Sequence, residues 1–196
     1  NMPPINLGKR LYYLIQYPHG CIEQTISSAF PQLYVSEIME VTEIQRKEIT
    51  LNIKAAIEKM KRFQNSGGGF SYWPGENGED AWSTIYAAHF LLEAKNLGYH
   101  VPDLMLSKWV KHQQRKAKNW SESSDEIGYY GSNNKLIQAY RLYALALAGE
   151  PEFGAMNRLR ESKHLPPTAM WRLAAAYALA GKPEVANQIV GNLTKV

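Results

Sequence analysis

The spacing of apolar residues predicts helices along most of the chain. Within residues 43–64, Ile49, Ile53, Ile57 and Met60 recur at intervals of four, four and three, with lysines between them. This spacing places one apolar stripe on a helix whose other faces are solvated. We therefore predict an outer helix over 43–64, packed through that single stripe.

Three further segments, 82–97, 136–148 and 168–180, are apolar nearly all round and rich in alanine, leucine, tyrosine and tryptophan. A helix without a polar face is usually buried on all sides, so we predict these three as inner helices, with Leu142 and Leu173 in the core. Patterns that alternate with a period of two are short, which leaves little evidence for strands. The fold class predicted from periodicity is all-α.

Glycine and proline separate these helices. A Tyr-Ala-Leu-Ala run that ends in Gly149 and Pro151 recurs before Gly181 and Pro183, and both pairs are 32 residues apart (181 − 149 and 183 − 151). Such a period marks a repeated helical hairpin, which builds either a solenoid or a closed α/α toroid. The glycine-rich stretch 66–78 does not suit a uniform solenoid and favours the toroid. Breaks are predicted at 18–20, 66–69, 73–78, 98, 128–131, 149–151, 166–167 and 181–183.

Composition narrows the class of protein. The 196 residues are 45% hydrophobic and 20% charged, which suits one folded domain over 1–196. Cys21 is the single cysteine, so an intrachain disulfide and a multi-cysteine zinc site are excluded. A net charge of +4 is too mild to indicate a nucleic-acid partner, and we expect no cofactor.

Residues 17–25 read Tyr-Pro-His-Gly-Cys-Ile-Glu-Gln-Thr and carry the candidate chemistry. Cys21 and Gln24 are three residues apart, so in a tight helical turn their side chains face one another. Attack of the thiolate on the side-chain carbonyl, with loss of ammonia, would close an internal thioester. Gly20 has no Cβ to clash with that ring, and Pro18 bounds the turn. Glu23 either assists the departing amide nitrogen or only favours a helix N-terminus.

Simpler interpretations exist for each of these residues. A lone cysteine beside an apolar helix is most often a small buried hydrophobe, and only the whole run 18–24 favours the thioester. His19 more simply fills the turn, and His89 more simply serves as a hydrogen-bonded core residue. The other histidines lie in no motif that assigns them a role: His100, His112 and His164.

Two other segments resemble binding motifs only superficially. Gly67-Gly68-Gly69 lacks the lysine and serine or threonine of a phosphate loop, so we expect a tight loop that leads to two buried anchors, Phe70 and Trp73. The basic run over 108–118 is more simply a solvated helix face.

The run 18–24 resembles the thioester motif Pro-x-Gly-Cys-x-Glu-Gln of the alpha-2-macroglobulin and complement family, and most of all its bacterial members. The resemblance continues in 30–34, 68–75 and 145–151, and so covers nearly the whole chain. It implies that Cys21 and Gln24 are the thioester partners. It also implies an α/α toroid like that of terpenoid cyclases and prenyltransferases. The chain departs from the vertebrate pattern of the family at Ile22, where glycine is common, and at Thr25, where asparagine is common, and this leaves the preferred nucleophile open.

The resemblance also implies a function. In this family, cleavage of a bait segment exposes the thioester, and a lysine amine or hydroxyl of the protease attacks Gln24 while Cys21 leaves. The chain would thus be a single-use acyl donor of an endopeptidase inhibitor and not an enzyme, from a periplasmic or cell-surface protein. We expect it to be shorter than the family's domain, to need the other domains of its parent chain, to expose apolar surface that favours self-association, and to hold no intact thioester on its own.

Two alternatives come from other classes of protein. A tetratricopeptide-like binding module would explain the 32-residue repeat but gives Cys21 and Gln24 no role. An enzyme with an α/α toroid, of the terpene-cyclase or prenyltransferase kind, needs an Asp-x-Asp-Asp motif or a zinc site, and the sequence contains neither. Amine labelling of Gln24 separates the thioester from both.

Overall fold

The computed structural model describes residues 12–122 and 134–193. These residues form helices joined by short loops; they contain no strand, and an isolated bridge pairs Gln64 with Phe70. The all-α prediction is confirmed, while the break predicted at 128–131 lies outside the described residues. In chain order the elements are α2 (Ile22–Ala29), the 3-10 helix η1 (Pro31–Leu33), α3 (Val35–Ile38), α4 (Glu43–Phe63), α5 (Ala81–Asn96), α6 (Asp103–Asn119), α7 (Asn134–Leu147), α8 (Phe153–Arg160), α9 (Pro167–Leu179) and α10 (Pro183–Leu193).

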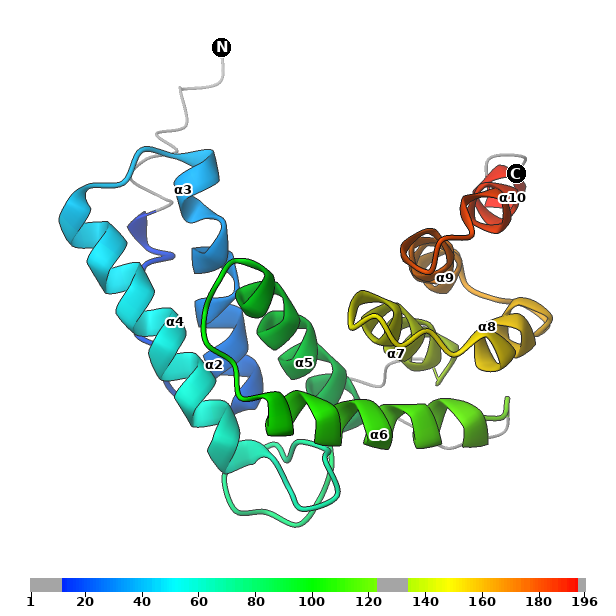
Figure 1. The fold of residues 1–196 in the computed structure, drawn as a ribbon, viewed down its shortest axis with the longest axis horizontal. Coiled ribbons are helices and arrows are strands. Elements are labelled where there is room, and N and C mark those ends of the chain that lie inside the picture. Colours follow the sequence, from blue (N-terminus) through cyan, green and yellow to red (C-terminus); the bar gives the residue numbers. More distant parts are fainter. Residues whose placement is uncertain (1–11, 123–133, 194–196) are drawn as a thin grey trace.

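The long helices alternate between two layers. In the inner layer α2 packs on α5, α5 on α7, and α7 on α9. In the outer layer α4 covers α2 and α5, α6 covers α5 and α7, α8 covers α7 and α9, and α10 covers α9. Figure 1 shows these hairpins following one another around an open arc. Alternating inner and outer helices along an arc are the arrangement of an α/α toroid.

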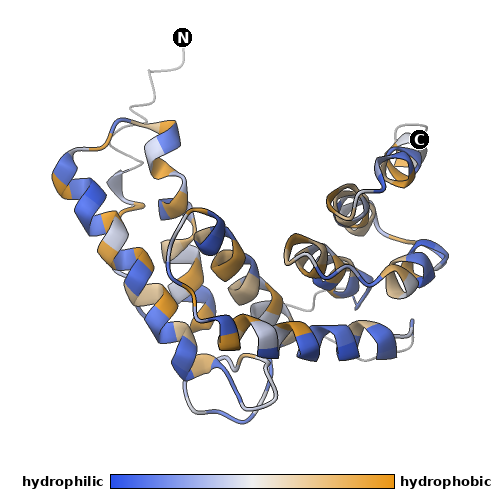
Figure 2. Ribbon diagram, in the orientation of Figure 1, coloured by the Kyte–Doolittle hydropathy of each residue, from blue (hydrophilic) through white to orange (hydrophobic). Residues whose placement is uncertain are grey.

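Burial explains why each helix takes its layer. On α4 the predicted stripe from Ile49 to Met60 is buried, whereas Leu51 between two of its members is exposed. Figure 2 shows α4 as largely hydrophilic and α5 as largely hydrophobic, as an outer and an inner helix should be. Leu142 on α7 and Leu173 on α9 are completely buried, which confirms the predicted inner helices.

One inner helix is less covered than predicted. Trp171 and Leu179 on α9 are about half exposed, at 54% and 48%. Among the described helices α9 packs mainly between α7 and α10, so part of its apolar surface meets solvent. The expectation of exposed apolar surface on an inner helix is met here, whereas the expectation of a shortened ring stays a prediction.

Glycine ends three of the helices in the same way. Gly98, Gly149 and Gly181 all have φ between 73° and 87°, in the left-handed region. In each case the next N–H donates to a carbonyl five residues back, at 2.9–3.0 Å, as in a Schellman motif. The 32-residue repeat therefore corresponds to two successive inner helices, α7 and α9, that end with the same cap.

We predict that Gly149→Ala lowers the free energy of unfolding by about 1 kcal/mol, because the left-handed backbone disfavours any side chain while the space around the new Cβ is open. Gly154→Ala in α8 is the matched control. Its Cβ also meets open space, and there the substitution should be neutral or stabilising by up to about 1 kcal/mol. Urea unfolding of both variants measures the difference, and equal effects would contradict the cap.

Candidate functional site

Cys21 and Gln24 meet at the start of α2. Cys21 has an extended backbone and is the N-cap, while Gln24 is the third helical residue. The backbone N–H of Cys21 donates to Oε1 of Gln24 at 3.1 Å, in the reciprocal arrangement of a capping box. The sequence had suggested that the pair lies inside a tight helical turn. In the structure the pair instead spans the boundary of the helix, with Cys21 as the N-cap outside it. The motif places a thiol and a carboxamide at one cap.

Gly20 makes this arrangement possible. Its φ is +87°, and a Cβ at this position would lie 1.9 Å from Oε1 and 2.9 Å from Cδ of Gln24. The carboxamide is therefore folded back over the Cα of Gly20, in space that any other residue would fill. The structure thus leaves no room for a Cβ beside the Gln24 carboxamide, whereas the predicted thioester ring stays a prediction.

The segment that leads into Cys21 is held by side chains. The carbonyl of Gln16 accepts hydrogen bonds from Ser28 Oγ at 3.2 Å and Gln32 Nε2 at 2.7 Å. Further along, the hydroxyl of the fully buried Thr25 lies 3.4 Å from the carbonyl oxygen of Gly20. Lys59 Nζ donates to the carbonyl of Pro18. Pro18 is buried, and its carbonyl lies outside regular structure and needs such a donor; the other bonds tie the exposed Gln16 and Gly20 to α2 and η1.

The loop between α4 and α5 supports the same cap. The N–H of Ile22, the first residue of α2, donates to the carbonyl of Tyr72 at 3.2 Å. Phe70 in this loop is completely buried, as predicted. Trp73 is 48% exposed, so the prediction that it is a buried anchor is wrong. Its ring packs edge-on against Tyr72. Phe70, and not Trp73, is the side chain that this loop buries in the core.

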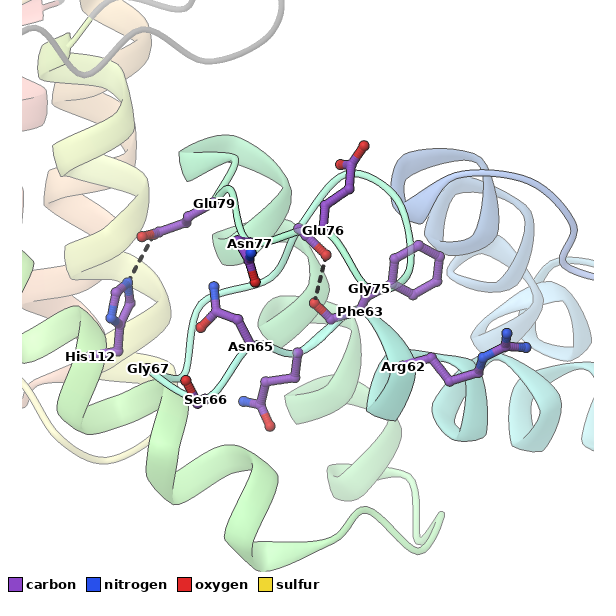
Figure 3. A pocket seen from close by; sticks show the side chains of 12 residues that line it. Arg62, Phe63, Asn65, Ser66, Gly67, Gly75, Glu76, Asn77, Glu79 and His112 are labelled. Atoms are coloured by element: carbon purple, nitrogen blue, oxygen red, sulfur yellow. Dashed lines mark hydrogen bonds and ion pairs between the residues drawn. The ribbon is translucent and has the colours of Figure 1, made fainter.

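A polar pocket lies beneath this loop and is shown in Figure 3. Glu79 accepts a hydrogen bond from Nε2 of His112 at 2.9 Å, and Arg115 donates to Nδ1 of the same ring at 3.0 Å. Arginine only donates, which fixes Nε2 as the protonated nitrogen of His112. Burial raises the pKa of Glu79, but the His112 bond and the nearby charge of Lys116 outweigh it and keep that pKa low. His112 therefore ties the loop to α6.

The concave face of the inner layer carries a second pocket, with an aromatic wall. Its lining residues are Glu23, Ser27, Phe30, Trp82, Tyr86, His89, Tyr140 and Arg172. Nδ1 of His89 lies 2.9 Å from the hydroxyl of Tyr140. Burial, aided by the charge of Arg172, lowers the pKa of His89 to about 4, against the opposite effect of Glu93. His89 is thus neutral at pH 7, and it is hydrogen-bonded as predicted, although it is half-buried at a pocket that it shares with Glu23 and is not fully in the core.

The remaining histidines are exposed. His19 stacks against Tyr17, with ring centroids 4.5 Å apart, and His100 and His164 lie at the surface. Over 12–122 and 134–193, no three His, Cys, Asp or Glu side chains are grouped so that they could hold a metal ion. No helix in these ranges is long and apolar enough to cross a bilayer.

Sequence reasoning did not identify Lys59 and Tyr72 as residues of the site. It named Thr25 but not its structural role. Lys59 and Tyr72 lie roughly 40 and 50 residues beyond the motif and reach it only through the packing of α4 and its loop on α2. No local pattern distinguishes Lys59 from the other lysines of α4.

The family of this chain follows from comparison with known proteins. A family model described as the A-macroglobulin TED domain matches residues 5–150, and the chain therefore belongs to this family. The alpha-2-macroglobulin of Escherichia coli K12 is 27% identical over 169 residues, which is 82% of this chain and 10% of the relative.

Solved structures of bacterial alpha-2-macroglobulins are also similar to this chain. Salmonella alpha-2-macroglobulin reacted with methylamine has a TM-score of 0.77 and 25% identity, over 96% of this chain and 13% of that one. For trypsin-activated Escherichia coli alpha-2-macroglobulin the TM-score is 0.76 at 23% identity, over 92% of this chain and 13% of that one, a likeness of fold. The fold is the α/α toroid of these thioester domains. The chain spans about a tenth of the length of the relatives it matches.

We predict that Gly20→Ala destabilises the protein more than Gly75→Ala. Both glycines have φ above 80°, so both variants lose about 1–2 kcal/mol from backbone strain. A Cβ at Gly75 meets open space, whereas one at Gly20 displaces the Gln24 carboxamide and removes its hydrogen bond, at a further cost of about 1 kcal/mol. Chemical unfolding of the two variants measures the difference, and identical losses would show that Gln24 does not occupy this space.

A second prediction concerns pH. The pKa of His89 is about 4 in the folded protein and 6.5 ordinarily, so between these values the unfolded chain binds a proton that the folded chain does not. The stabilising contribution of neutral His89 is complete above pH 6.5 and is lost as the pH falls towards 4. His89→Gln should flatten the fall of the unfolding free energy over this range, and His100→Gln, at an exposed histidine, should leave it unchanged. An unaltered slope in His89→Gln would contradict this assignment.

Proposed function

We propose that Cys21 and Gln24 close an internal thioester in an alpha-2-macroglobulin-like protease inhibitor, of which residues 1–196 are one domain. The observation that carries this proposal is the Gln24 carboxamide, folded over Gly20 and hydrogen-bonded to the backbone of Cys21. A capping box alone does not require a glycine at this place, and a buried structural cysteine does not require the glutamine. The thioester gives a role to all three residues.

Formation of the ring balances without a co-reactant. The Cys21 thiolate attacks Cδ of Gln24, the C–N bond breaks, and the nitrogen leaves as ammonia with the thiol proton and its own two hydrogens. The backbone N–H of Cys21 holds the Gln24 carboxamide at the same cap, and such preorganisation favours an intramolecular attack over the reaction with water. Glu23, one residue before Gln24 and almost fully buried, is the proposed assistant that passes a proton to the leaving nitrogen.

Capture reverses this chemistry with a new nucleophile. A lysine amine of a protease attacks the same Cδ, the C–S bond breaks, and Cys21 leaves as a thiolate while the amine nitrogen loses a proton. A thiolate is a better leaving group than an amide or an alkoxide, so the acyl group moves to nitrogen, or to a hydroxyl as an ester. The Salmonella relative is described as reacted with methylamine and the Escherichia coli relative as activated by trypsin. Each thioester reacts once, so the domain is an acyl donor and not a catalyst.

The proposed thioester must be protected from water, and the described residues alone do not provide this protection. Cys21 is only 3% exposed, but Gln24 lies on the surface. Water hydrolyses a thioester that it reaches, so a further domain of the same parent protein is proposed to cover Gln24 until a protease triggers its release. By analogy with its relatives, the parent protein is proposed to be exported to the periplasm or cell surface. The isolated domain is expected to lose the bond and to associate through exposed α9.

We predict that Cys21→Ala in the full-length protein abolishes covalent capture of trypsin and costs about 1 kcal/mol of stability, since it removes one small buried group. Conjugates that resist denaturant are counted by gel electrophoresis after the protease is added. Ser27→Ala, six residues further along α2, is the control and should capture trypsin like the wild type. Conjugates formed by Cys21→Ala would place the acyl donor elsewhere.

A further inference from the structure

We infer that Lys59 is a positioning residue of the site, and that it holds the segment before Cys21 in the geometry from which the thioester forms. This inference rests on the proposed function. Lys59 lies on the outer helix α4, whereas Cys21 and Gln24 belong to the inner helix α2 and its cap.

Lys59 makes two contacts with this segment. Its Nζ donates a hydrogen bond to the carbonyl of Pro18 and lies 5.0 Å from the ring centroid of Tyr17, within the range of a cation–π interaction. The Tyr17 ring in turn packs against His19, at 4.5 Å between centroids. One ammonium group thus contacts or supports three consecutive residues that lead into Gly20.

The Lys59 bond supplies a donor to a backbone carbonyl that requires one. Pro18 is buried and has no N–H, and the donor to its carbonyl is the side chain of Lys59 and not a backbone N–H of a helix or strand. The donors to Gln16 and Gly20, by contrast, come from α2 and η1 themselves: Ser28, Gln32 and Thr25. Those bonds keep the segment close to α2, whereas the Lys59 bond fixes it relative to the outer layer.

The neighbouring charges leave Lys59 available for this role. Adjacent residues of a helix do not face one another, so Glu58 does not compete for Lys59; it pairs with Lys61, whose Nζ lies 2.7 Å from both of its oxygens. A second link from α4 is indirect: Asn52 donates to Gln32 at 3.0 Å, and Gln32 bonds Gln16. Lys59 is thus the side chain of α4 that contacts the residues directly before the cap.

The two contacts of Lys59, with the Pro18 carbonyl and the Tyr17 ring, form a clamp, and the position of Gly20 depends on it. Gly20 lies against the Gln24 carboxamide, so a shift of residues 17–20 changes the room in which Cδ meets the thiol. Intramolecular reactions are very sensitive to such shifts, and a displacement of about 1 Å costs up to about a hundredfold in rate. Loss of the clamp should therefore reduce formation of the thioester far more than it reduces stability.

The test compares Lys59→Met, Lys59→Arg and Lys61→Met in the full-length protein. Thioester content is measured as the fraction with a mass lower by one ammonia and by methylamine incorporation at Gln24, beside a melting curve. We expect Lys59→Met to lose about tenfold in content while it still melts cooperatively. Lys59→Arg should retain wild-type content within about twofold, because a guanidinium also donates to a carbonyl and stacks on tyrosine. Lys61→Met should match the wild type.

Several results would overturn the inference: wild-type content in Lys59→Met, an equal loss in Lys59→Arg, or an equal loss in Lys61→Met. If Lys59→Met does not fold, Tyr17→Leu decides, since it removes the ring that Lys59 and His19 contact and leaves the Lys59 bond to Pro18 in place; a severalfold loss supports the clamp and no loss contradicts it. A wild-type protein without thioester or methylamine incorporation refutes the proposed function itself, and the inference falls with it.

Discussion

The contact between the Gln24 carboxamide and the Cys21 backbone is the interaction on which the rest of the site depends. It forms at a helix cap, where the first N–H groups of a helix have no partner inside the helix and attract a side-chain oxygen. An ordinary capping box uses serine or threonine at the cap. With Cys21 there, the same cap carries a thiol, and its backbone N–H bonds the amide side chain of Gln24. In the proposed function, this general device for starting a helix prepares an acyl-transfer site.

The toroid gives this cap its rigidity. The inner helix α2 is packed between α4 and α5, and the loop that joins those two helices returns to bond the first N–H of α2 through Tyr72. That loop is itself fixed, because Phe70 is buried and Glu79 is tied to His112 on α6. Helices α4, α5 and α6 and the loop between α4 and α5 are distant in sequence from the cap of α2. Together they determine the position of this cap.

The sequence was sufficient for the features that depend on local patterns. Periodicity located α4, α5, α7 and α9 to within two residues, because each buries a face or a whole surface that the pattern records. The role of Gly20 also followed from the sequence, since only the smallest residue fits beside a folded-back side chain. The exposure of Trp73 did not follow. Its hydrophobicity favoured an anchor, but Phe70 already fills the inward position.

Contacts across the layers were beyond the reach of sequence patterns. Lys59 and Tyr72 act on the cap through one hydrogen bond each, and nothing in their own neighbourhood marks them. Thr25 was visible in the motif only as a departure from the residue common there. Its buried hydroxyl, directed at the carbonyls of the turn, became apparent only in three dimensions.

The intact mass of the freshly purified full-length protein, followed by peptide mapping, tests the central claim most directly. The account predicts a mass lower than that of the sequence by one ammonia, and it predicts that methylamine adds to Gln24 while Cys21 becomes available to a thiol reagent. A native mass that matches the sequence, with Cys21 free before any amine is added and Gln24 unmodified afterwards, would contradict the account.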